Sequence, residues 1–192
     1  PFDIGVNQRM TKQELAQAMS FLDDRFHFIE AEETIPTIDW LLNKARAACV
    51  RHGINGLVID PYNEIDSTRD GNKREDEHIR DLISKCKQFC RAHNVTMWLV
   101  AHPAKMQRGS DGSYPPPSLY DVSGSAHWNN MADVGMVVHR DFEADQTRVI
   151  IRKIREQGLY GSIGEAFFKY SLARHVYEPE VIQPEATSYY GD

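Results

Sequence analysis

The sequence has few cysteines, no long apolar run and no excess of positive charge. Its three cysteines in 192 residues show no CxxC spacing, which argues against a disulfide framework and a cysteine zinc site and favours reduced, intracellular thiols. No apolar stretch approaches the roughly 18 residues that a membrane-spanning helix needs. The eight histidines show no HxH or HxxxH spacing, which argues against a structural transition-metal site. The net charge of −6 excludes a uniformly basic surface, although local basic segments remain.

Two short apolar runs stand out against these absences. Gly56-Leu-Val-Ile-Asp60 ends in an acid followed by Pro61, and Thr96–Ala101 ends in His102 followed by another proline. Continuous apolar runs bounded by turn residues are typical of strands buried on both faces in a parallel sheet. The amphipathic segment between them has the length of a crossover helix. The sequence therefore predicts an α/β domain whose ligand-binding edge lies at the carboxyl ends of these strands.

Periodicity and turn residues predict further elements along the chain. Thr11-Lys-Gln-Glu14 has the form of a capping box that opens a helix, and a second helix is expected to end near Gly53. The remaining predicted elements are short strands at 26–31, 134–139, 147–154 and 165–170, with hairpin character at the glycine-rich 157–164 and an extended tail over 179–192.

Asp60 and His102 are the first candidates for chemistry. An aspartate at the end of a buried strand can hold a hydrated Mg²⁺ through its water shell, and a polar residue at the end of the next strand can sense a phosphate. The alternatives are an ordinary acid in the turn after a strand and a structural histidine. The residue pattern alone does not decide between the functional and the ordinary interpretation of either residue.

Two basic segments are the other candidates. Lys105 and Arg108 lie in a loop over 104–120 that is rich in glycine, serine and proline, and basic residues there suit a nucleic-acid backbone. Lys153 and Arg155 share one side of an alternating strand, as in a phosphate clamp or an arginine finger. The alternatives are a solvated surface loop and an edge strand protected by charges.

Four segments, in this order, resemble the motor domain of DnaB-like, RecA-type replicative helicases, in the branch of Twinkle and the phage primase-helicases. The first resembles that family's Walker B strand, the second its sensor strand, the third its Gly-Ser-Ala turn and Ala-Asp pair, and the fourth its Lys-x-Arg strand. These segments are Gly56–Asn63, Trp98–Lys105, Asp121–Arg140 and Ile151–Gly164. The match covers roughly 25–172 and is specific as an ordered set.

The resemblance implies a RecA-like P-loop NTPase core with a mostly parallel sheet, flanking helices and a C-terminal β-hairpin. It implies ATP or another NTP and Mg²⁺ as cofactors, with Asp60 holding the metal through water. Asp60, Asn63, Lys153 and Arg155 are then expected at the nucleotide, and Asp60, His102, Lys153 and Arg155 in catalysis. The expected DNA-binding residues are Lys105, Arg108, Ser123, Ser125, His127 and Asn129.

The implied partners are single-stranded DNA, a homo-hexamer and a primase. The implied compartment is the cytoplasm of a bacterial or phage-infected cell, with mitochondria as the open alternative. The implied activity is NTP-driven translocation on single-stranded DNA and duplex unwinding.

The sequence departs from the family in lacking GxxxxGK[ST] anywhere. We therefore expect residues 1–178 to be a partial motor domain truncated before Pro1, with negligible ATP hydrolysis of its own. Three rival interpretations stay open: a recombinase-type ATPase, a metal-dependent phosphoesterase with Asp60, Asn63 and His102 as ligands, and an inactive, nucleotide-free binding module.

Overall fold

The computed structural model describes residues 10–31, 35–65, 74–110, 112–122, 126–172 and 174–180. They fall into two compact units, one running from Met10 to Asp133 and one built on the strands from Val134 onward. No helix within the described ranges has the length and apolarity to cross a bilayer.

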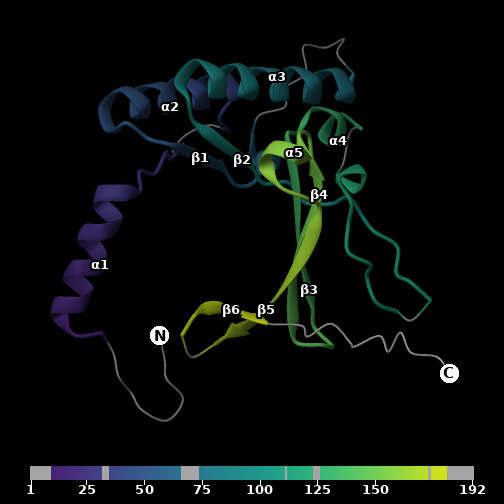
Figure 1. Ribbon diagram of the computed structural model, residues 1–192. Coiled ribbons are helices and arrows are strands. Elements are labelled where there is room, and N and C mark those ends of the chain that lie inside the picture. The colour runs from purple at the N-terminus through teal and green to yellow at the C-terminus, as the bar shows by residue number, and fades with distance from the viewer. Residues whose placement is uncertain are drawn as a thin grey trace. The chain divides into compact units, whose positions relative to one another are not determined.

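The first unit packs helices against a small parallel sheet (Figure 1). Its elements, in chain order, are α1 (Lys12–Arg25), α2 (Ile38–His52), β1 (Gly56–Ile59), η1 (Tyr62–Glu64), α3 (Glu75–His93), β2 (Thr96–Leu99), η2 (Leu119–Asp121) and α4 (His127–Met131). β1 and β2 pair in parallel, with Gly56 opposite Thr96 and Ile59 opposite Leu99. The predicted strand–helix–strand core is therefore present.

α3 supplies most of the core of this unit. Its buried stripe follows helical spacing, as the sequence predicted, and the helix ends at Asn94, whose φ of 52° is the left-handed conformation typical of a helix C-terminus. The stripe consists of Ile79, Leu82, Ile83, Cys86 and Phe89. These side chains pack with Leu57 and Ile59 of β1 and with residues of α2 in one cluster. The core thus fixes the strand that ends at Asp60.

The sheet is buried on one face only, against the prediction that both faces would be covered. Leu57 and Ile59 point into the core, whereas Val58 is 61% exposed and Trp98, opposite it in register, is 47% exposed. The Trp98 ring lies over Gly56, where an added Cβ would come within 2.8 Å of it. Val58 and Trp98 both line a cavity beside β1.

The N-terminal part of the unit has the predicted start of α1 but lacks the strand predicted after it. Thr11 and Glu14 form the predicted capping box of α1, with the Thr11 N–H donating to Glu14 Oε2 at 2.7 Å. The predicted strand at 26–31 is wrong: this segment is irregular. Its alternating Phe-His-Phe-Ile satisfies the local pattern of a strand, but a strand also needs a ladder of hydrogen bonds to a neighbour.

The second unit is an antiparallel sheet of four strands in sequential order. The strands are β3 (Val134–Asp141), β4 (Gln146–Ile154), β5 (Gly164–Ser171) and β6 (Val176–Glu180), with the short α5 (Gln157–Tyr160) between β4 and β5. The expected C-terminal hairpin is therefore part of a larger sheet. The tail predicted over 179–192 begins inside β6, and its residues 181–192 lie outside the described ranges.

Candidate functional site

Asp60 lies directly after β1, at the carboxyl edge of the parallel sheet, and is exposed. Backbone hydrogen bonds tie this edge together, because the Val100 N–H donates to the Ile59 carbonyl at 2.9 Å and the Tyr62 N–H donates to the Val100 carbonyl at 2.9 Å. The ends of the two strands are thus fixed side by side. An exposed carboxylate on such a fixed edge suits a cation held through water.

The turn after Asp60 is anchored in the core on its far side. The Tyr62 ring packs edge-on against Trp128 of α4, with ring centroids 4.6 Å apart. Burial, with a smaller contribution from the charge of Glu75, raises the pKa of Tyr62. Asn63, which the sequence predicted at the nucleotide, is exposed in η1, three residues after Asp60. The turn therefore presents Asp60 and Asn63 outward while Tyr62 holds it in place.

His102 is exposed and follows the end of β2 by three residues. It stands at the entrance to the long loop, because the next residue, Pro103, forms a β-bridge with Val122. The parallel pairing places the ends of β1 and β2 at the same edge, and Asp60 and His102 follow these two ends. The sensor role of His102 stays a prediction.

The loop between Pro103 and Val122 is closed at its base by a β-bridge. Figure 1 shows that the chain runs out along one leg of this loop and returns along the other. The Ala104 N–H donates to the Asp121 carbonyl at 2.6 Å, beside the bridge. Near the tip, the Gly109 N–H donates to the Ser113 carbonyl at 2.8 Å. The loop therefore has defined legs, which carry the exposed Lys105 and Arg108.

Of the other predicted DNA-binding residues, Ser123 and Ser125 lie outside the described ranges. His127 opens α4 and is half-buried. Asn129 donates from its side-chain Nδ2 to the Tyr120 hydroxyl at 2.7 Å. α4 itself is held to α3, because Lys87 Nζ donates to the Met131 carbonyl at 3.0 Å.

Lys153 and Arg155 belong to the second unit. Lys153 lies in β4 opposite Gly135, and Ile151 lies opposite Met136, so Arg152 is the additional residue of a β-bulge. Arg155 follows the last residue of the strand. The bulge lies before Lys153 and the strand ends at Ile154, so regular strand alternation does not extend to Arg155. Their action on a nucleotide stays a prediction.

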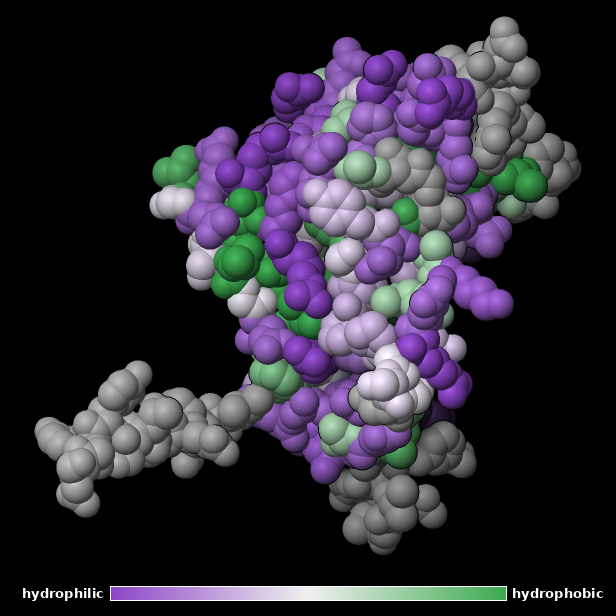
Figure 2. Space-filling view, turned by 90° about the vertical axis from the view of Figure 1, so that its right-hand side faces the viewer, coloured by the Kyte–Doolittle hydropathy of each residue, from purple (hydrophilic) through white to green (hydrophobic). Residues whose placement is uncertain are grey.

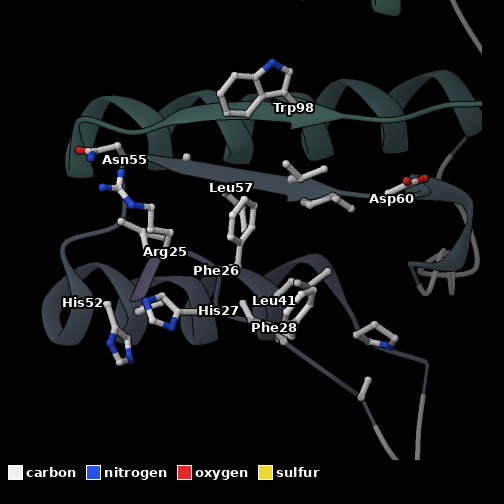
Figure 3. Close-up of a pocket in the computed structure, with 18 of the residues that line it drawn as sticks. Arg25, Phe26, His27, Phe28, Leu41, His52, Asn55, Leu57, Asp60 and Trp98 are labelled. Atoms are coloured by element: carbon white, nitrogen blue, oxygen red, sulfur yellow. The ribbon is translucent and has the colours of Figure 1, made fainter. Parts of the chain in front are cut away.

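A cavity of about 1080 Å³ borders β1 in the first unit, and no pattern in the sequence indicates it. Figure 3 shows the segment after α1 on one side of β1, with Arg25 near Asn55 at one end of the strand and Asp60 at the other. His27 and His52 stack in its wall with ring centroids 3.9 Å apart. The two histidines are distant in the chain, and their contact depends on the path of the irregular 26–31 segment, so no local pattern signals it.

No group of three or more histidine, cysteine, aspartate or glutamate side chains in the described part of the chain could hold a metal ion. The phosphoesterase interpretation, which needs Asp60, Asn63 and His102 as a joint ligand set, gains no support from this arrangement. A single carboxylate that shares Mg²⁺ with phosphates and water needs no such group.

The parallel pair of β1 and β2, connected through α3 and with Asp60 at its carboxyl edge, is an α/β arrangement found in RecA-like folds. A solved structure of a DnaB-like replicative helicase, described with its interactions with primase, shares the fold at a TM-score of 0.68. The two chains are 17% identical, and the match covers 91% of this chain and 44% of that chain. The predicted fold class is confirmed.

Sequence comparison gives the family. A family model described as an AAA domain matches residues 6–108. The Twinkle homolog protein, chloroplastic/mitochondrial, of Arabidopsis thaliana is 38% identical over 183 residues, which make up 92% of this chain and 25% of that protein. The chain belongs to the AAA domain family, and its resemblance to the DnaB-like and Twinkle branch is confirmed. It spans about a quarter of the length of the Arabidopsis relative.

Proposed function

We propose that this chain is the C-terminal portion of the ATPase motor domain of a hexameric replicative DNA helicase. In this role it couples NTP hydrolysis to translocation on single-stranded DNA and to duplex unwinding. The observation that carries the proposal is Asp60, an exposed carboxylate on the fixed carboxyl edge of a parallel sheet, in a chain 38% identical to the Twinkle homolog.

The chemistry assigned to Asp60 follows from its position. Its carboxylate fits a Mg²⁺ held through water molecules, and such an ion neutralises charge on the phosphates of a bound ATP. Asn63, exposed in the same turn, is suited to face the nucleotide, and His102 stands where the second strand leads into the loop. Lys153 and Arg155 are assigned to a nucleotide held by the neighbouring subunit.

The proposed partners are single-stranded DNA, five further copies of the protein and a primase. The Arabidopsis relative is named as a chloroplastic or mitochondrial protein, and the solved helicase structure is described together with its interactions with primase. For this chain, both the primase contact and the cytoplasm of a bacterial or phage-infected cell are proposals.

The test is Asp60→Asn in the full-length gene product that contains these residues. Loss of the carboxylate should lower ATP hydrolysis about 10²- to 10³-fold, because it removes several kcal/mol of metal-mediated charge stabilisation. Steady-state phosphate release at saturating Mg²⁺ and ATP measures the change.

Glu64→Gln is the matched control, because it removes the same charge from an exposed position in the same turn. It should leave turnover near the wild-type value. Equal turnover in Asp60→Asn and wild-type protein would contradict the proposal.

A further inference from the structure

Two exposed tyrosines accompany the basic residues of the long loop. Tyr114 is 50% exposed on the leg that returns from the tip, and Tyr120 is 61% exposed at the base. Large aromatic side chains at such exposure are not needed for the core of the unit. Proteins that bind single-stranded nucleic acid combine cations with aromatic rings on which bases stack.

Tyr120 is held in place from two sides. Its hydroxyl accepts a hydrogen bond from Asn129 Nδ2 of α4 at 2.7 Å, and its backbone N–H donates to Ser118 Oγ at 3.2 Å. The ring is thus oriented before any ligand arrives. An oriented side chain loses little conformational entropy on binding, which favours its use as a platform.

A cavity of about 730 Å³ lies beside Tyr120, between the two legs of the loop. Lys105 and Met106 line it from the outgoing leg, and Pro115 and Pro116 line it from the returning leg. Asp121 also lines it, and its carboxylate accepts from the Ser118 N–H at 2.6 Å and from Ser118 Oγ at 2.8 Å.

The charge of Asp121 decides which part of a nucleotide suits this cavity. These hydrogen bonds from Ser118 lower the pKa of Asp121, so the carboxylate is ionised at neutral pH and repels a phosphate. An uncharged base, flat and largely apolar on its faces, meets no such repulsion. Lys105, on the opposite leg, is then placed to bind the phosphate next to that base.

The tip of the loop repeats the pairing of ring and cation. The Arg108 guanidinium lies 5.1 Å from the centroid of the Tyr114 ring, in cation–π geometry. A guanidinium plane and an aromatic ring both stack on bases. The loop therefore carries two sites of the same chemistry, one at its base and one at its tip.

We propose that the Tyr120 ring is a stacking platform for one base of single-stranded DNA, with the Tyr114–Arg108 pair as a second platform at the tip. The inference rests on the proposed function and deepens it, because it assigns the loop to bases as well as to phosphates. Stacking is tolerant of sequence, since every base has an aromatic face. This tolerance suits a protein that moves along DNA of any sequence.

The experiment measures binding to two fluorescent 20-nucleotide strands, oligo-dT and an abasic strand with the same phosphates but no bases. Tyr120→Leu in the full-length gene product should weaken oligo-dT binding about 5- to 100-fold, the range for loss of one base–aromatic stack. Binding of the abasic strand should stay within about twofold of the wild-type value. Tyr120→Phe, which keeps the ring but loses the hydrogen bond from Asn129, should bind oligo-dT more weakly than the wild type and more tightly than Tyr120→Leu.

Each other outcome overturns part of this inference. An equal loss on both strands would mean that Tyr120 acts only by positioning the loop. Unchanged binding of Tyr120→Leu, together with weakened binding of the Lys105→Ala/Arg108→Ala variant, would overturn the stacking inference while supporting the DNA-binding role of the loop. Unchanged binding in both variants would overturn that role as well.

Discussion

The two units of the molecule differ in how their sheets are buried. In the first unit, two strands pack into a cluster of thirteen buried side chains from helices, strands and turns. In the second, the buried residues of the four strands are Gly135, Val137, Thr147 and Ile150 among the described residues, while Val134, Met136 and Val138 of β3 are between 50% and 64% exposed. On the face shown in Figure 2, hydrophilic residues predominate and hydrophobic residues form separate patches.

The candidate site residues of the two units therefore have different structural support. The first unit presents Asp60 from a strand whose core is complete within the unit. The second presents Lys153 and Arg155 from the end of a strand that is irregular at its bulge. In the proposed hexamer, the first unit holds the nucleotide and the second acts on a nucleotide of the adjacent subunit. Four changes, ordered from the largest expected effect to the smallest, test the roles proposed for residues of the two units.

The largest expected effect is at Arg155. Arg155→Ala in the full-length gene product should lower ATP turnover about 10³- to 10⁵-fold while nucleotide binding persists, as for loss of an arginine finger. Arg152→Ala, which removes the same charge from the bulge, is the matched control and should retain turnover. Phosphate release and binding of a fluorescent ATP analogue measure the two properties.

Mixing subunits sharpens this test. Arg155→Ala and Asp60→Asn proteins are each expected to be inactive, but a mixed ring contains interfaces at which an intact Asp60 faces an intact Arg155. Such rings should regain partial turnover. Absence of recovery in rings verified to co-assemble would contradict action across the subunit boundary.

The next effect concerns the two cores. Phe89 is 4% exposed in α3, so Phe89→Ala should lower the free energy of unfolding by about 3–5 kcal/mol through reduced burial and a residual cavity. Val138→Ala, at a position 64% exposed in β3, should change it by less than about 0.5 kcal/mol. Urea denaturation of this chain measures both, and similar decreases would show that the second unit has a core comparable to the first.

A smaller effect is expected from the basic legs of the loop. Lys105→Ala combined with Arg108→Ala should weaken single-stranded DNA binding and reduce the slope of log K against log salt by about 1.4, or about 0.7 for each phosphate that is no longer neutralised. Lys44→Ala with Arg51→Ala on α2 removes the same charge elsewhere in the unit and should leave the slope unchanged. An unchanged slope in the loop variant would mean that the loop is a solvated surface loop that does not bind DNA phosphates.

The smallest effect is the titration of Asp121. Because its pKa is lowered in the folded loop, it stabilises the loop above the ordinary carboxyl pKa, and that contribution is lost as the pH falls through the lowered value. Ser118→Ala removes one of its two donors and should move the pKa part of the way back up. Carbon-detected NMR titration of Asp121 measures the shift, with Ser84→Ala in α3 as a control that should leave it unchanged.

Local sequence patterns predicted the parts of the fold that depend on residues close together in the sequence. The stripe of α3, the capping box at Thr11 and the two apolar strands each follow from spacing within one segment. The irregular path of 26–31 and the bulge at Arg152 were not predictable, because both depend on which strand edge is available as a partner.

The candidate site divides in the same way. Asp60 and His102 were predicted because each ends an apolar run. Tyr120 was missed because its significance arises from Asn129, nine residues away on α4. A side chain whose orientation is set by a contact between a loop and a helix has no periodic signal in the sequence.

The contact between Tyr62 and Trp128 has a mechanical consequence. Trp128 is 7% exposed and close-packed, so a shift of the turn after Asp60 is expected to move its ring and the helix that carries it. Trp128 belongs to α4. The residue after it, Asn129, donates a hydrogen bond to the Tyr120 hydroxyl. Side-chain contacts and one short helix thus form a linkage between the strand end and the loop. Movement of the turn after Asp60 is therefore expected to reach the Tyr120 ring by way of Trp128 and Asn129.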